Sequence, residues 1–188
     1  MRKELMNYEA LLKFTRDISI TRDPEQVVFP IVESVARVLE AKGCALFLFN
    51  PEADKLELAA SHGLSDEYLN KGPISSIRSI ALSLQDGPVA ISDVADDPRI
   101  QYPEEAKKEG ICSMLSVPII MHRDPIGALR VYSGIPWEAT LENVNFVQAM
   151  AQLAGMALEM CRLYKGLKDR IEILEMTRGP KPMDGQKP

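Results

Sequence analysis

The chain has 188 residues, of which 46% are hydrophobic and 26% charged, a composition typical of one globular domain rather than a disordered or fibrous chain. Its net charge of −5 gives no electrostatic reason to expect binding to nucleic acid. No apolar run reaches the roughly 18 residues that a membrane helix requires, and the acidic N-terminus lacks a signal core. We therefore expect a cytoplasmic protein without a membrane partner.

Metal and disulfide chemistry are not indicated by the sequence. The three cysteines lie far apart, and no Cys-x-x-Cys or Cys/His cluster is present. We therefore expect no metal ligands and no disulfide framework. The three cysteines are Cys44, Cys112 and Cys161.

Two helices are predicted at the N-terminal end. Residues 3–19 are rich in helix formers, and their apolar side chains recur every three or four positions, as in an amphipathic helix. Asp23 followed by Pro24 is typical of a capped start for a second helix, and Gly43 is placed to end it. The repeating residues of the first helix include Tyr8, Leu11, Thr15 and Ile18.

Two antiparallel strands are predicted next. The stretch 44–49 is short and almost wholly apolar, which favours a central buried strand. A turn at 50–54 separates it from 55–61, which alternates enough to form the second strand. A short helix is predicted over 75–84, with its apolar side chains on one side.

The middle of the chain predicts short elements around an acidic loop. Residues 89–91 suit a brief strand, and 92–101 are predicted to be a loop because they hold three aspartates and a proline. Turn formation explains these aspartates better than a cation site. Residues 103–109 favour a short helix that ends at Gly110.

The strongest hairpin signal lies between Gly110 and Tyr132. Two apolar runs, 113–121 and 126–132, flank a polar break at 122–125. The break contains Asp124 before Pro125, which is turn chemistry because proline cannot donate to a sheet ladder.

The two faces of this hairpin differ in character. Successive strand residues point to opposite faces, so one face is apolar throughout and suited to packing on helices. The other face carries an arginine and a tyrosine, and is either a solvated surface, with Arg130 snorkelling to water, or the wall of a polar pocket. The apolar face holds Leu115, Val117, Ile119, Leu129 and Val131, and the mixed face holds Met114, Ser116, Ala128, Arg130 and Tyr132.

One long helix is predicted from Glu138 to about Met176. Its first half has a broad apolar stripe for packing on the sheet, at Leu141, Val144, Val147, Ala151, Ala154 and Leu158. The pattern then narrows to a heptad seam at Leu153, Ala157, Met160, Tyr164, Leu167, Ile171 and Leu174.

The seam predicts a homodimer, because a strict four-three repeat keeps one line of side chains facing a partner helix. The alternative is that the first helix covers the seam within the chain, through Tyr8, Leu11 and Ile18. Arg178 to Pro180 is expected to stop the helix, and the last ten residues, rich in Pro, Gly and Lys, are expected to be disordered.

The order of these elements resembles the GAF domain family. The resemblance rests on EGICSMLSVPI, IGALRVYS and the long terminal helix, with CALFLFNPEADKLELAASHGL fitting the first hairpin. It implies an α+β fold with a central antiparallel sheet of five or six strands. Helices from both chain ends would lie on one face, with a small-ligand pocket, its loops and short helices on the other. The expected division is an N-terminal helix of a dimer bundle at 1–22, a sensory domain at 23–159, a coiled-coil-like extension at 160–178 and a tail at 179–188.

The resemblance also implies where a ligand would bind. The pocket face of the late hairpin would supply contacts, and the segment 94–102 would cover them. Arg130 could pair with an acidic group, since its fork suits carboxylate or phosphate. The candidate ligand contacts are Met114, Ser116, Arg130, Tyr132, Tyr102 and Val94.

Known subfamilies of GAF domains differ from this sequence at their signature positions. Phytochrome-like members carry a Cys beside a His in the short helix, where this chain has 101–104, QYPE. The dipeptide Asn70-Lys71 occurs without the rest of the cyclic-nucleotide signature. Free methionine sulfoxide reductases use clustered cysteines, whereas Cys112 stands alone and is expected to be non-catalytic.

The sequence thus favours a regulatory module without enzymatic activity or a cofactor. It would bind a small molecule and signal to a partner protein or fused domain through paired terminal helices. The alternatives are an enzyme of the free methionine sulfoxide reductase type and a dimerisation module without a ligand, since one fold hosts several functions.

Overall fold

The computed structural model describes residues 8–16, 24–75 and 87–177. Its centre is a six-stranded antiparallel sheet with the strand order β3-β2-β1-β6-β5-β4. The strands are β1 (Gly43–Asn50), β2 (Lys55–His62), β3 (Ile74–Ser75), β4 (Val89–Ile91), β5 (Ser113–Met121) and β6 (Asp124–Ser133). The helices are α2 (Pro24–Val38), α3 (Asp66–Leu69), α4 (Pro103–Glu109) and α5 (Leu141–Thr177), preceded by a helical stretch at 8–16.

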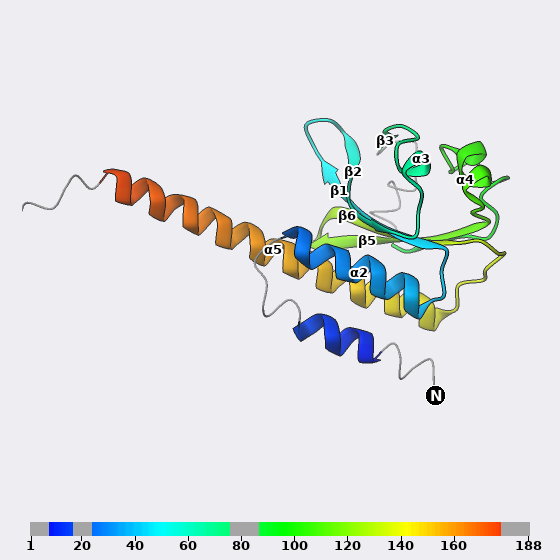
Figure 1. The fold of residues 1–188 in the computed structure, drawn as a ribbon, viewed down its shortest axis with the longest axis horizontal. Coiled ribbons are helices and arrows are strands. Elements are labelled where there is room, and N and C mark those ends of the chain that lie inside the picture. Colours follow the sequence, from blue (N-terminus) through cyan, green and yellow to red (C-terminus); the bar gives the residue numbers. More distant parts are fainter. Residues whose placement is uncertain (1–7, 17–23, 76–86, 178–188) are drawn as a thin grey trace, which may run out of the picture.

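The helices lie in layers on the two faces of the sheet (Figure 1). The long helices α2 and α5 pack side by side under one face, and the short helices α3 and α4 stand on the other. The helical stretch 8–16 lies outside the layer of α2 and α5, and buries Phe14 in the core. This arrangement confirms the predicted α+β class, the antiparallel sheet and the placement of the terminal helices. No helix in the described ranges is long and apolar enough to cross a membrane.

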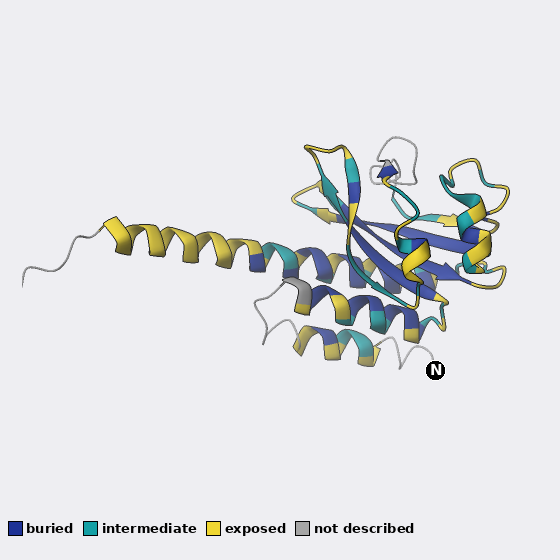
Figure 2. Cartoon of the chain, turned by 45° about the horizontal axis from the view of Figure 1, so that its top comes forward, coloured by how far each residue is buried: buried dark blue, intermediate teal, exposed yellow. Residues whose placement is uncertain are grey.

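Strand alternation divides the interior into two apolar clusters. The cluster on the helix side takes Leu115, Val117, Ile119, Leu129 and Val131 from the hairpin. The cluster on the other side takes Met114, Ala128 and Tyr132 from the same two strands. Successive side chains point to opposite faces of a strand, so the parity read from the sequence is confirmed. The figure coloured by burial shows β5 and β6 as the most buried part of the sheet (Figure 2).

The tight turn of the late hairpin takes only the first two residues of the break predicted at 122–125, and the second strand begins two residues earlier than predicted. His122 and Arg123 form it, with φ of 51° and 76°. The type I′ turn, one of the two-residue turns that match strand twist, has positive φ at both central positions. Asp124 and Pro125 belong to β6, and Pro125 pairs with Ile120 where the register shifts. Proline is tolerated there because the ladder is already irregular.

Gly43 does not end the second helix. That helix ends at Val38, and Glu40 takes the left-handed conformation with φ of 51°. The backbone amide of Ala41 donates to the oxygen of Ala36 at 2.9 Å and closes the helix end. Gly43 is the first residue of β1, where a Cβ would lie 2.8 Å from the oxygen of His62.

The apolar stripe of the terminal helix begins one turn later than predicted. Leu141 is the first residue of α5 and is 76% exposed. The amide of Asn143 donates to Oγ1 of Thr140 at 3.2 Å, which caps the helix and leaves its first residue facing solvent. From Val144 to Leu158 the predicted stripe does pack against the helix-side cluster.

The second half of α5 projects away from the rest of the chain (Figures 1 and 2). Every residue from 162 to 177 is exposed in the single chain. The helical stretch 8–16 does not cover this part, so within the described residues the intrachain alternative for the seam is wrong. Tyr8 is 62% exposed, while Leu11 is half-buried against the core.

Several predictions concern residues outside those described. They include nearly all of the helix expected over 75–84, of which only Ser75 is described, as the end of β3. The cap at Asp23, the position of Ile18 and the tail from 178 onward also lie outside the described residues. The division of the chain into bundle helix, sensory domain, extension and tail stays a prediction.

Candidate functional site

A small cavity lies between the sheet and the short elements that cover it. β5 and β6 form its floor through Met114, Arg130 and Tyr132, and its walls come from the segment around α3 and from 94–102. Its enclosed space is about 30 Å³. This is room for two or three water molecules or for a ligand of a few atoms. Its apolar lining comes from Ile74, Val94, Ile100, Ala106, Ile111 and Met114.

Arg130 is held inside the protein by the strand that carries it. β6 is a central strand, paired with β1 on one side and β5 on the other, so its side chains cannot reach the sheet edge. Arg130 is only 6% exposed, and its guanidinium carbon lies 5.2 Å from the centroid of the Phe47 ring. It also shares a side-chain hydrogen bond with Tyr132. The interpretation of Arg130 as a snorkelling surface residue is therefore wrong.

Two tyrosines stand beside Arg130. The rings of Tyr68 and Tyr132 meet edge to face, with centroids 5.8 Å apart and an interplanar angle of 83°. Burial raises the pKa of both phenols, and the positive charge of Arg130 only partly opposes this. Both hydroxyls therefore stay protonated near neutral pH and can donate hydrogen bonds.

Lys71 brings a second positive charge to the cavity. Its Nζ donates to the backbone oxygen of Tyr68 at 2.9 Å and lies 3.6 Å from the centroid of the Tyr68 ring. Burial, followed by the charge of Arg130, lowers the pKa of Lys71 to about 8, while Glu109 and Glu105 act in the opposite direction. Lys71 is therefore an amine that titrates close to physiological pH.

Contacts between α3 and α4 fix the position of Tyr68 and Lys71. The amide of Tyr68 donates to Oγ of Ser65 at 3.1 Å, which caps α3. The amide of Ser65 donates to Oε1 of Glu109 at 3.0 Å, and its hydroxyl donates to Oε2 of the same carboxylate. Gly110 ends α4 with φ of 74°, a conformation that glycine adopts without strain. The carboxylate of Glu109 thus ties the α3 wall to the α4 wall.

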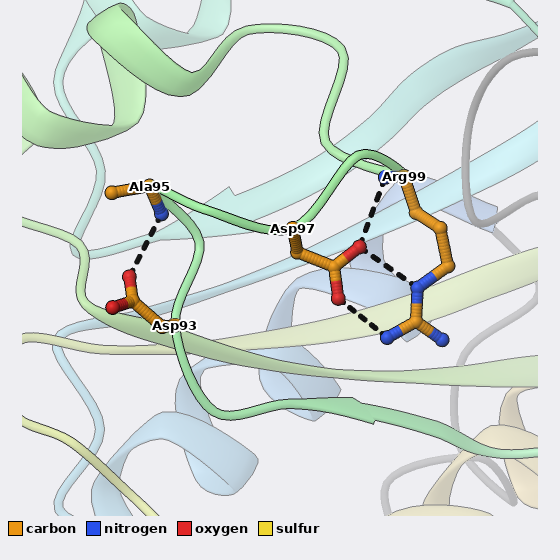
Figure 3. A network of polar contacts seen from close by, with 4 residues as sticks. All are labelled: Asp93, Ala95, Asp97 and Arg99. Carbon is orange, nitrogen blue, oxygen red and sulfur yellow. Dashed lines mark hydrogen bonds and ion pairs between the residues drawn. The ribbon is translucent and has the colours of Figure 1, made fainter.

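The acidic loop uses its aspartates to stabilise turns (Figure 3). Oδ1 of Asp93 accepts from the amide of Ala95 at 2.9 Å, and Oδ1 of Asp97 accepts from the amide and Nε of Arg99, each at 2.9 Å. The hydrogen bonds from Arg99 lower the pKa of Asp97. In the described part of the chain, no three His, Cys, Asp or Glu side chains are grouped to hold a metal ion. These contacts agree with the turn role predicted for the aspartates.

The loop is also hydrogen-bonded to the segment between α3 and β3. The hydroxyl of Tyr102 and Nε2 of Gln101 both donate to the backbone oxygen of Pro73 at 2.9 Å. Gly72 has φ of 135°, and a Cβ there would lie 2.6 Å from the Tyr102 hydroxyl. The close approach of the two segments therefore depends on glycine at this position.

Five of the six predicted ligand contacts line this one cavity. They are Met114, Arg130, Tyr132, Tyr102 and Val94. Ser116 is buried on β5, paired with Arg130 and Val89, but does not line the cavity. Whether these residues bind a ligand stays a prediction.

Tyr68 and Lys71 were missed in the sequence. They lie between a strand and a segment without clear periodicity, and only the fold brings them opposite β6. The dipeptide Asn70-Lys71 matches only a fragment of the cyclic-nucleotide signature. No local pattern identifies a half-buried lysine, because burial depends on which distant elements pack over it.

The cysteines lie apart from the cavity. Cys44 points into the helix-side cluster, and its burial raises the pKa of the thiol. Cys161 lies on α5 in the same cluster. Cys112 precedes β5, and its Sγ donates to the backbone oxygen of Gly134 at 3.1 Å. None of the three lines the cavity.

Comparison with protein families gives a match over most of the chain. Residues 23–158 match the family described as GAF domain. The chain belongs to the GAF domain family. Comparison of this GAF domain with curated protein sequences found no match.

Solved structures share the fold at low sequence identity. The GAF domain from a phosphoenolpyruvate-protein phosphotransferase of Coxiella burnetii is 20% identical with a TM-score of 0.77, over 86% of this chain and 98% of that chain. The free methionine-R-sulfoxide reductase of Neisseria meningitidis, solved with its substrate, is 17% identical with a TM-score of 0.73, over 87% and 94%. The chromophore-binding domain of bacteriophytochrome RpBphP3 from R. palustris is 12% identical with a TM-score of 0.71, over 88% and 64%. At these identities the likeness shows the GAF fold alone, on proteins of different activity.

Proposed function

We propose that this chain is a cytoplasmic regulatory GAF module that binds a small molecule in the cavity and signals through α5. The observation that carries the proposal is the double role of β6. Arg130 and Tyr132 reach the cavity from this strand. Leu129 and Val131 alternate with them and point to the opposite face, where they pack in the cluster that contains residues of α5. A ligand that shifts β6 by a fraction of an ångström would act on both faces at once, because packed interiors transmit strain.

The projecting half of α5 supports assembly as a homodimer. Leu167 is 60% exposed in the single chain, and the other seam residues from Met160 onward are exposed as well. Apolar residues at strict four-three spacing bury that surface by pairing with another helix. A second copy of the chain offers the same seam across a two-fold axis. The proposed dimer contacts are the exposed seam residues Met160, Tyr164, Leu167, Ile171 and Leu174, with Tyr8 and Leu11 as candidate contacts from the N-terminal helix.

Replacing Leu167 and Ile171 with glutamate tests the dimer. We expect a folded monomer by sedimentation, because like charges would face each other across the axis. The matched control replaces Arg162 and Lys165 with glutamine, which changes the net charge by the same amount away from the seam. A wild-type chain that stays monomeric at tens of micromolar, roughly where weak dimers form, contradicts the dimer.

Ligand binding is tested on the purified wild-type chain. Mass spectrometry before and after denaturation is expected to show a small molecule released in proportion to protein. Variants that fill or uncharge the cavity serve as controls for its location. A chain that neither co-purifies with a small molecule nor binds one added to it would contradict the sensory role and leave a ligand-free dimerisation module.

We further propose that the chain is not an enzyme of the methionine sulfoxide reductase type. The support is the separation of the cysteines from the cavity and the burial of Cys44 on the opposite face. The test is thiol-dependent reduction of free methionine sulfoxide, for which we expect no turnover. Activity that disappears in Cys112→Ser would overturn this part of the proposal.

A further inference from the structure

The cavity is positive although the chain as a whole is negative. Three basic residues, Lys71, Arg99 and Arg130, are among its described lining residues, and no described lining residue is an aspartate or glutamate. The net charge of the chain is −5. This local excess of positive charge is a property of the site rather than of the composition.

The three cations are not equivalent. Arg99 is exposed on the rim and is paired with Asp97, so its charge is largely neutralised (Figure 3). Lys71 and Arg130 lie deeper, and the charge of Arg130 is one of the causes that lower the pKa of Lys71. Each therefore raises the free energy of keeping the other charged, and an anion between them would relieve both.

The two carboxylates that act on Lys71, those of Glu105 and Glu109, do not line the cavity. Glu109 accepts two hydrogen bonds from Ser65 and lies 3.9 Å from Nζ of Lys42. It faces the groove between α3 and α4 rather than the cavity, as does Glu105. Their charges act on Lys71 without occupying the enclosed space, which leaves a place for an anion from solution.

We propose that this cavity binds a small oxoanion, such as a short carboxylate or a nitrate-sized ion, between the ammonium of Lys71 and the guanidinium of Arg130. The inference rests on the proposed function and names the ligand class of the same site. A guanidinium fork suits a planar oxoanion, and charge-assisted hydrogen bonds are strongest where water is excluded. The space of about 30 Å³ admits an ion of a few heavy atoms, whereas a nucleotide would have to extend out of it.

This ligand class implies that binding depends on pH. The groups that face Lys71 are Arg130 and Tyr132 on β6, Tyr68 on α3, and Glu105 and Glu109 on α4. The phenols stay protonated, because burial raises the pKa of each. Lys71 is then the member of this set that titrates near pH 8, and an anion would favour its protonated form. We expect affinity to fall as pH rises above about 8, with proton uptake on binding.

The experiment titrates the full chain by NMR with formate, acetate and nitrate, and with acetamide as the neutral analogue of acetate. Ionic strength is held constant with gluconate, which is too large for the cavity. The expected result is saturable binding of at least one of the three anions, weakened about tenfold or more in Lys71→Met, as for loss of a charged hydrogen bond. Lys107→Met, which removes an equal charge from the exposed side of α4, should bind as the wild type does.

A second variant guards against a structural effect of the first. Arg130→Lys keeps the charge but removes the fork, and is expected to weaken binding while the chain stays folded by circular dichroism. In the wild type, affinity should fall between about pH 7 and pH 9.5, and this dependence should disappear in Lys71→Met.

Two results would overturn the inference. Acetamide binding as tightly as acetate, with no loss in Lys71→Met, would refute the oxoanion and leave the small-molecule sensor standing. No binding by any of the three anions would also refute it, and the mass measurement would then decide separately whether the sensory role fails as well.

Discussion

The two faces of the hairpin β5–β6 are built from alternate residues of the same two strands. Toward α2 and α5, the five side chains of the predicted apolar face are aliphatic and at most 1% exposed. Toward α3 and α4, Ser116, Arg130 and Tyr132 are polar and are also buried, at 2%, 6% and 1% exposed. One face thus resembles an ordinary hydrophobic core, while the other contains a buried charge that contributes little to stability.

The difference indicates how the chain separates stability from binding. Removing aliphatic surface from water drives folding, so the helix-side cluster is where most of the stabilising free energy arises. A buried guanidinium loses hydration and regains it only in part from its neighbours. Its presence on one face alone is therefore best explained by the cavity. Substitutions on the two faces should have correspondingly different effects.

The largest effect is expected from Leu129→Ala on the helix side. Leu129 is fully buried between α5 and the sheet, and truncation should lower the free energy of unfolding by about 3 kcal/mol through lost transfer energy and a residual cavity. Chemical denaturation measures this change. Leu58→Ala, at an exposed position of β2, is the matched control and should change stability by less than about 1 kcal/mol. Equal losses for the two variants would contradict the assignment of the core.

A smaller loss is expected from Gly127→Ala, where β6 passes β1. A Cβ at Gly127 would collide with the backbone oxygen of Phe47, so the strands must separate at a cost of about 2 kcal/mol. Gly166→Ala is the control, since that glycine lies in the exposed part of α5 with open space around it. It should raise helix stability by roughly 0.5–1 kcal/mol. A Gly127→Ala variant that melts no lower than the wild type would show that the strand contact is less tight than described.

The cavity side should tolerate loss of its charge. Replacing Arg130 with methionine keeps apolar volume and removes a buried charge, so the free energy of unfolding should change by no more than about 1 kcal/mol in either direction. Ligand binding should be lost in the same variant. Denaturation and binding assays on one preparation separate the two effects, and a loss of several kcal/mol would mean that Arg130 is a structural residue.

The smallest effect is the pH dependence of stability due to Lys71. Its pKa is lowered to about 8 in the folded chain, so between about pH 8 and the ordinary value of 10.5 the unfolded state binds more protons. Stability from this group therefore rises with pH across that window. Because Lys71 is half-buried, solvent screening limits the rise to roughly 1 kcal/mol or less. The difference between wild type and Lys71→Met, measured by denaturation at several pH values without added anion, should show this slope.

Much of the fold could be predicted from local patterns. Short apolar runs and alternation predict β1, β2, β4, β5 and β6, and the Pro start and Gly end predict α4, because these signals depend on the residue and its immediate neighbours. The errors lie at boundaries. The hairpin turn at His122 and Arg123 and the left-handed Glu40 carry no glycine, and β3 has only two residues. Each is stabilised by pairing with a distant strand or by a helix end rather than by its own sequence.

In the candidate site, too, only the features that depend on a local pattern could be predicted from the sequence. The parity of β5 and β6 follows from the sequence alone, because alternation is a property of any strand, and it gives the side chains that share a face with Arg130. The burial of this face, the packing of Tyr68 and Lys71 over it and the position of Ser116 outside the cavity follow only from the packing of distant elements. The reason is physical: burial and electrostatic coupling depend on distances between elements far apart in the chain, and no local pattern encodes those distances.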